Sequence, residues 1–199
     1  MKQLIQSAII LTTASMIFYG CGSEEAYIQK ASAAITKESF EKAEKFAQEA
    51  KTINPASREA DIILTYVKYE EYMLHAAFWV EDTDAVKYLA KVVKDVDSED
   101  PRYNAPLIVL AAAWGREDMV KALLDAGSNP NSGSDKDGLT ALMWAAKNFN
   151  EQYEMVKLLI DAGAKVNVTS KHDETPLSIA LEYNNPRIAE LLRKNGATH

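Results

Sequence analysis

The 199-residue sequence predicts an all-α protein, a helical solenoid of stacked helix pairs that follows a short helical unit. One pattern recurs three times in the C-terminal half, as "APLIVLAAAWGREDMVKALLDAGSNPN", "LTALMWAAKNFNEQYEMVKLLIDAGAKVN" and "ETPLSIALEYNNPRIAELLRKNGATH". The apolar residues of each copy fit the packing faces of short amphipathic helices. Residues 24–65 are rich in Ala, Glu, Lys and Gln, which are strong helix formers. These observations together favour helices throughout.

Each of the three copies contains the parts of a helix pair. In the third copy Thr175 is expected to cap the first helix, with Pro176 in the first turn, where a missing N–H costs nothing. "MVKALLDAG" and "MVKLLIDAG" are amphipathic second helices, and left-handed C-caps are expected at Gly127, Gly163 and Gly196. One such pair cannot bury its apolar face alone, so we expect stacked copies with a continuous core.

These copies resemble ankyrin repeats. Thr140-Ala141-Leu142 and Thr175-Pro176-Leu177 match the start of that family's first helix, and Gly163-Ala164-Lys165-Val166-Asn167 matches the end of its repeat. The family's His is replaced in the three copies, which implies that its local hydrogen bond is missing at Val109, Met143 and Ser178. The resemblance implies an ankyrin-repeat domain over 70–199, with a degenerate copy at about 70–98 and further copies at about 102–133, 137–168 and 171–199.

A separate helical unit is predicted over residues 21–69. Phe40, Ala43, Ala47 and Ala50 recur at steps of three and four and therefore share one helix face. Asn54-Pro55 is expected to end that helix. The spacing resembles one tetratricopeptide helix pair, with Tyr27 and Ala31 on its first helix. A generic helical hairpin that caps the repeats is the alternative.

Residues 1–20 have the parts of a secretory signal: Lys2, the largely apolar "AIILTTASMIFY", and Gly20 before Cys21. The stretch resembles a bacterial lipoprotein signal peptide, in which the cysteine is lipidated and becomes the mature N-terminus. The resemblance implies lipid attachment at Cys21, a membrane anchor, and a location in the bacterial cell envelope, at the outer membrane facing the periplasm. An uncleaved or ordinarily cleaved signal and a plain helix end are the alternatives.

Few residues suggest chemistry. One cysteine excludes an intrachain disulfide and a cysteine-rich zinc site. His75 is the best catalytic candidate, but it occupies the family's Leu-His-Ala-Ala position, where we prefer a structural role. "GSDKDG" would need a Glu six residues after Gly138 to bind calcium, and Trp144 stands there. We therefore expect no enzyme, no metal, no cofactor and no small-molecule substrate.

The charge distribution bears on the partner. Residues 24–100 carry 17 acidic against 10 basic side chains, which argues against nucleic acid as a partner. The expected partner is another protein, and the acidic half favours a basic one. By position, the ankyrin resemblance implies partner contacts at Arg102, Tyr103, Trp114, Lys136, Asp137, Leu139, Lys147, Asn148, Lys171, His172, Glu174, Glu182 and Tyr183. Alternatively, Trp114 and Tyr183 pack between repeats and the polar residues are merely solvated.

The expected function is protein binding by a membrane-tethered repeat array. By analogy, a narrower role is an immunity protein that neutralises a toxin arriving in the periplasm. The alternative is a scaffold that stabilises an envelope assembly or an oxidative-stress enzyme.

Overall fold

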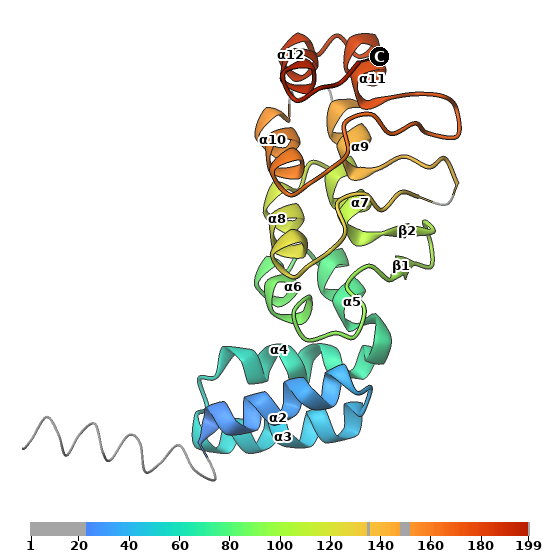
Figure 1. Cartoon of the computed structure of the whole chain (residues 1–199). Coiled ribbons are helices and arrows are strands. Elements are labelled where there is room, and N and C mark those ends of the chain that lie inside the picture. The colour runs from blue at the N-terminus through green and yellow to red at the C-terminus, as the bar shows by residue number, and fades with distance from the viewer. Residues whose placement is uncertain (1–22, 135, 148–151, 199) are drawn as a thin grey trace, which may run out of the picture. The chain divides into compact units, whose positions relative to one another are not determined.

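The computed structural model describes residues 23–134, 136–147 and 152–198 (Figure 1). Within these residues it has eleven α-helices, one 3₁₀ helix and one short antiparallel hairpin, so the predicted all-α repeat fold is confirmed. The chain divides into two compact units. Unit 1 holds the described residues up to Ala76 together with Val92–Lys94, and unit 2 holds Ala77–Lys91 and the described residues from Asp95 onward.

Unit 1 begins as a helical hairpin. Its elements are α2 (Glu24–Thr36), α3 (Phe40–Ile53), α4 (Arg58–Tyr66) and the 3₁₀ helix η1 (Val67–Tyr72). The small residues Ala43, Ala47 and Ala50 of α3 are fully buried, which allows α2 to pack closely against them. Helix α3 ends at its C-cap Asn54, as the following proline predicts.

The start of α2 is tied to the end of α3. Asn54 Nδ2 donates to Glu24 Oε2 over 2.7 Å, and Ser57 Oγ caps α4 by accepting from Ala60 N. Helix α4 adds a third helix to the predicted pair. The tetratricopeptide resemblance, like the predicted boundary after residue 69, stays a prediction.

Unit 2 is a stack of helix pairs. Helix α5 (Met73–Trp79) runs across the boundary between the two units, and its end is followed by α6 (Thr83–Leu89). The next pairs are α7 (Leu107–Ala113) with α8 (Glu117–Asp125), α9 (Ala141–Lys147) with α10 (Tyr153–Asp161), and α11 (Pro176–Glu182) with α12 (Pro186–Lys194). Figure 1 shows α7, α9 and α11 stacked in one column and α8, α10 and α12 in the other.

The core of unit 2 lies between these columns. Helices α7 and α9 are almost entirely buried, whereas α11 also exposes Ser178, Leu181 and Glu182. Ala111, Ala145 and Ala180 are at 0% exposure because neighbouring helices pack directly on them. The second helices bury one face, as Met119, Val120 and Leu123 of α8 show. Between α6 and α7 the chain forms a hairpin from β1 (Glu99–Asp100) and β2 (Ala105–Pro106), paired antiparallel.

The predicted helix ends are confirmed. Gly127, Gly163 and Gly196 have φ of +94°, +93° and +90°, the left-handed conformation that glycine adopts most readily. Thr175 caps α11 by accepting from Ser178 N over 3.1 Å, and Ser178 Oγ in turn accepts from Thr175 N over 2.8 Å. The expectation that the third copy lacks a local hydrogen bond at the family's His position is therefore wrong, because the Ser178 hydroxyl makes one.

Asparagine side chains connect each repeat to the next. Asn131 Nδ2 donates to Gly163 O over 3.1 Å, and its Oδ1 accepts from Lys165 N over 2.8 Å. One repeat later, Asn167 Nδ2 donates to Gly196 O over 2.9 Å and its Oδ1 accepts from Thr198 N over 3.0 Å. Each asparagine thus satisfies two backbone groups beside a glycine C-cap.

The same position one repeat earlier holds an acid. Asp97 accepts from Asn129 N and from the Ser128 hydroxyl. A carboxylate cannot donate, so the serine hydroxyl contributes the proton that an asparagine amide supplies elsewhere. A second connection between repeats comes from Asn185, which precedes α12. Its Nδ2 donates over 2.8 Å to the carbonyl oxygen of Ala146 in α9.

No helix in the described ranges is both long enough and apolar enough to cross a membrane. The predicted signal peptide (residues 1–20) and Cys21 lie outside the described residues.

Asn131→Ala or Asn167→Ala should lower the free energy of unfolding by about 1–2 kcal/mol, since each removes two hydrogen bonds between repeats. Asn131→Asp keeps the acceptor and loses the donor, so its loss should be smaller. Urea denaturation followed by circular dichroism measures these changes. Asn195→Ala is the matched control, because the bond described for the Asn195 amide goes to Leu191 O at the end of its own helix. Equal losses in Asn131→Ala and Asn195→Ala would contradict the role of the Asn131 side chain in connecting the repeats.

Candidate protein-binding site

Four aromatic side chains meet at the start of unit 2. The ring centroids of Trp79 and Tyr103 are 5.5 Å apart, and the two ring planes are nearly parallel. The ring centroids of Trp79 and Trp114 are 5.0 Å apart, with an angle of 63° between the ring planes. Tyr103 meets Trp114 edge-on at 5.7 Å, and Phe78 lies buried beneath them. Tyr103 and Trp114 keep 51% and 40% of their surface exposed, so the cluster faces solvent.

Three elements bring these rings together. Trp79 is the last residue of α5, Trp114 is the C-cap of α7, and Tyr103 lies in the β1–β2 turn. The turn is closed by Asp100 O, which accepts from Tyr103 N over 3.1 Å and from Asn104 N over 2.8 Å. Asn104 takes a positive φ of +47°, a conformation that Asn tolerates better than most residues.

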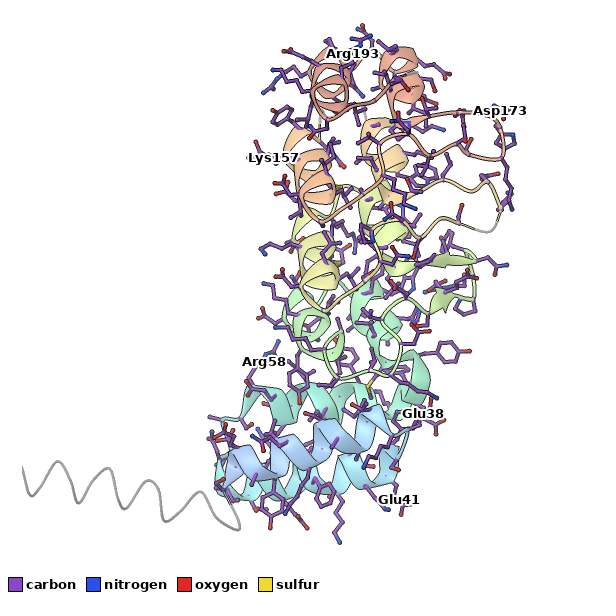
Figure 2. All side chains as sticks on the ribbon, in the orientation of Figure 1. Glu38, Glu41, Arg58, Lys157, Asp173 and Arg193 are labelled. Atoms are coloured by element: carbon purple, nitrogen blue, oxygen red, sulfur yellow. The ribbon has the colours of Figure 1, made fainter. Side chains whose placement is uncertain are left out.

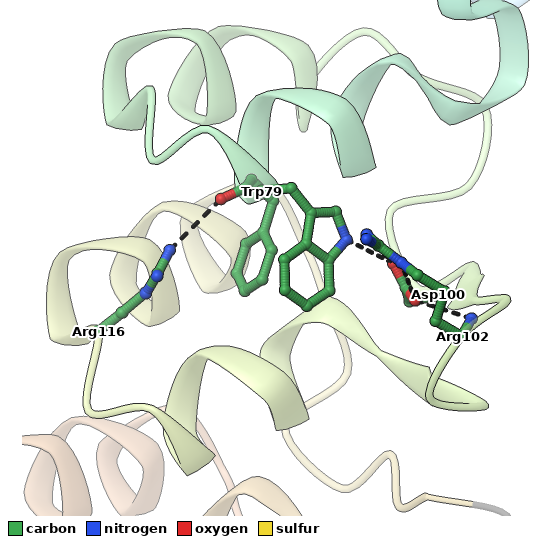
Figure 3. Close-up of polar contacts among 5 residues, drawn as sticks. Trp79, Asp100, Arg102 and Arg116 are labelled. Carbon is green, nitrogen blue, oxygen red and sulfur yellow. Dashed lines mark hydrogen bonds and ion pairs between the residues drawn. The ribbon is translucent and has the colours of Figure 1, made fainter.

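The buried Asp100 carboxylate fixes the positions of Trp79 and Arg102 by hydrogen bonds. Its side chain is 1% exposed, and it accepts from Trp79 Nε1 over 2.6 Å and from Arg102 N over 2.9 Å (Figure 3). Burial raises the pKa of Asp100, but the hydrogen bonds from Trp79 and Arg102 and the arginine charge outweigh it, so the pKa lies below its ordinary value. The carboxylate is therefore ionised at neutral pH and orients both side chains.

Arg102 completes the exposed surface. Its guanidinium carbon lies 3.9 Å from the Trp79 ring centroid, and its Nη2 lies 3.3 Å from Asp100 Oδ2. The side chain is still 57% exposed. We call Trp79, Tyr103, Trp114 and Arg102 the aromatic–arginine surface.

Arg116 supports the cluster from α8. Its Nη1 donates to Phe78 O over 3.4 Å (Figure 3). Its Nη2 pairs with Glu81. Both contacts join the start of α8 to the preceding repeat, so Arg116 positions the rings rather than presenting itself to a partner.

A shallow hollow of about 520 Å³ adjoins the aromatic–arginine surface. It is lined by Arg102, Tyr103, Asn104 and Lys136. Arg102, Tyr103 and Lys136 are all residues that the sequence predicts to contact a partner, and the structure brings them together. Trp114 joins them through its contact with Tyr103.

The other predicted residues are more dispersed. Lys147 Nζ lies 5.3 Å from the ring centroid of Trp144 and 5.3 Å from that of Tyr183. The Lys147 side chain therefore connects α9 to the end of α11. At the loop tips His172 faces Asp137 at 3.5 Å, and Lys171 N donates to Asp137 O. Leu139 is 6% exposed and packs in the core, so its side chain is withdrawn from any partner. Glu182 and Lys171 are exposed, Glu174 is half-buried with its carboxylate near Ser170, and Asn148 lies outside the described residues.

The sequence prediction missed Trp79 and Asp100. Trp79 belongs to the degenerate copy, where no surface positions were assigned. The signal was nevertheless present, because "FW" at 78–79 and "AW" at 113–114 end two consecutive first helices. Asp100 gave no such signal, since its role depends on a hydrogen bond to a side chain 21 residues earlier.

His75, the best catalytic candidate in the sequence, belongs to unit 1. It is 4% exposed and meets Tyr72 edge-on at 5.9 Å. Within the described ranges no group of three potential metal-ligating side chains converges. The chemistry available at the aromatic–arginine surface is recognition, through stacking, cation–π contact and charged hydrogen bonds.

Asp100→Asn should lower the free energy of unfolding at pH 7 by about 1–3 kcal/mol, because a neutral amide replaces the charged acceptor for Trp79 and Arg102. The folded pKa lies below the ordinary value of about 3.9, so the ionised carboxylate stabilises the fold above that pH. This stabilisation is lost as the pH falls through the folded pKa. Urea titrations should therefore show the difference between wild type and variant shrinking from pH 5 downward. Exposed Asp161→Asn is the control, and a pH-independent difference for Asp100→Asn would contradict the assignment.

Comparison with known proteins identifies the family to which the repeats of this chain belong. The family model for ankyrin repeats (3 copies) matches residues 73–170 and 134–199. Over 91 residues the chain is 43% identical to the ankyrin repeat and KH domain-containing protein mask-1 of Caenorhabditis elegans, a match that covers 45% of this chain and 3% of the nematode protein. The chain therefore spans a small part of that relative. The matched family model covers more than half of the sequence, and the chain belongs to the ankyrin-repeat family.

Proposed function

We propose that this protein binds another protein through the aromatic–arginine surface. Ankyrin-repeat domains are typically binding modules without catalytic activity. The observation that carries the proposal is the joint exposure of Tyr103 and Trp114 in direct contact with each other. Exposed aromatic groups that touch one another mark interaction sites more often than scattered ones do. Tyrosine, tryptophan and arginine are also the residues that most often dominate interface energy.

The surface is ordered before a partner arrives. Asp100 and the Trp79 ring hold the Arg102 guanidinium from two directions, and the hydrogen bond to Asp100 holds the indole of Trp79. Side chains that are already immobilised lose little conformational entropy on binding. This preorganisation supports a role for these residues as anchors.

For the cellular location we propose a lipid anchor at Cys21 in the bacterial cell envelope, at the outer membrane facing the periplasm. The proposal rests on Lys2, the apolar run that follows, and the Gly20-Cys21 pair. The repeats would then meet their partner in the periplasm.

For the biological role we propose toxin neutralisation, with scaffolding of an envelope or oxidative-stress assembly as the alternative. Both roles need only binding. Neighbouring genes distinguish them: an adjacent toxin gene supports neutralisation, and an envelope operon supports scaffolding.

Tyr103→Ala and Trp114→Ala should each abolish or strongly reduce capture of the partner by the immobilised full chain, because each removes an exposed anchor. Tyr69→Ala is the matched control, since Tyr69 is 46% exposed and lies in unit 1. Mass spectrometry of the captured proteins compares the variants. A partner that binds all three variants equally would refute the assigned surface.

Cells fed labelled palmitate should label the wild-type chain and leave Cys21→Ala unlabelled, because Cys21 is the only thiol in the sequence. Electrophoresis with fluorography measures the label. Equal labelling of both chains, or labelling of neither, would contradict the anchor.

A further inference from the structure

The hollow beside the aromatic–arginine surface has a cationic lining. Arg102 and Lys136 enter it from different repeats, and Tyr103 and Asn104 supply the rest of the described lining. Among the residues described, no carboxylate lines it. Asp100, two residues before Arg102, is 1% exposed and is already engaged by Trp79 and Arg102. The described lining thus offers two cations, Arg102 and Lys136, to a ligand in the hollow.

We infer that the partner contributes an acidic segment, in which an Asp or Glu stands beside an aromatic or large aliphatic side chain. The inference rests on the proposed binding function and specifies the partner's chemistry. The carboxylate would enter the hollow between Arg102 and Lys136. A guanidinium carries five N–H donors, and the bonds described for Arg102 use Nε and Nη2, which leaves donors for a second carboxylate.

Tyr103 accounts for the apolar half of the segment. Its ring lines the hollow and also meets Trp114 edge-on at 5.7 Å. A side chain next to the bound carboxylate therefore reaches the exposed faces of Tyr103 and Trp114. The two recognition elements lie side by side, so one short segment can use both.

This chemistry differs from the basic partner that the sequence favours. That expectation rests on the acidic excess over residues 24–100, which acts over long range and is screened by salt. Among the described acids that are close in sequence to the lining residues, Glu99 is exposed on β1 and Asp137 faces His172. At the contact itself the opposing charges are Arg102 and Lys136, and short-range complementarity decides which segment is accepted.

The test is selection of 12-residue peptides from a phage-displayed random library on the immobilised full chain. Wild type should enrich peptides with Asp or Glu beside Phe, Trp, Tyr or Leu. Synthetic copies of an enriched peptide should bind Lys136→Glu and Arg102→Gln about tenfold more weakly, with weaker dependence on salt. Lys136→Glu leaves the Asp100 network intact, so it remains informative if Arg102→Gln is destabilised.

The matched control is Lys157→Glu with Arg193→Glu, which reverses two exposed charges on α10 and α12. Figure 2 shows both residues on the second-helix side of unit 2, away from the loop tip that carries Asp173. This control should bind the peptide as wild type does. Enrichment of basic or uncharged peptides that still need Trp114 would overturn the acidic segment and leave the binding surface standing. Enriched peptides that bind Trp114→Ala and Tyr103→Ala unchanged would overturn the proposed surface itself.

Discussion

Stacking of neighbouring helix pairs is the interaction on which unit 2 depends. Its helices are seven or nine residues long, too short to be stable alone in water. Each first helix gains its burial from the repeats beside it, as the fully buried Ala111, Ala145 and Ala180 show. Asn131 and Asn167 then satisfy backbone groups of the next repeat. Packing and hydrogen bonding thus act across the same boundaries.

This arrangement leaves the ends of the first helices and the loops free for recognition. At the start of the array the β1–β2 hairpin returns Tyr103 to the end of α5, where Asp100 binds the Trp79 indole. The same carboxylate orients Arg102. One buried acid therefore links the fold of the hairpin to the order of the surface that we propose as a binding site.

Much of the fold could be predicted from the sequence because its signals are local. The C-cap glycines, the Thr175-Pro176 helix start and the end of α3 at Asn54 each depend on a few adjacent residues. The exposure of Arg102, Tyr103, Trp114 and Lys136 could be predicted because these residues occupy the loop and helix-end positions of the repeat, and their contact with a partner stays a prediction.

The rest depends on contacts between distant residues. Trp79 and Asp100 are 21 residues apart, and no spacing rule joins them. Leu139 occupies a surface position in the repeat alignment, yet it packs inward. Ser178 stands at the family's His position and makes local bonds of its own to Thr175, because a hydroxyl both donates and accepts. A substitution pattern alone does not reveal such compensation.

Site-specific photocrosslinking in the source cells tests most directly whether the partner contacts the aromatic–arginine surface. A benzophenone amino acid placed at Tyr103 should yield a covalent adduct of defined mass with one protein. The same probe at Lys157, on α10, should yield none. The same adduct from both positions, or an adduct only from Lys157, would contradict the account.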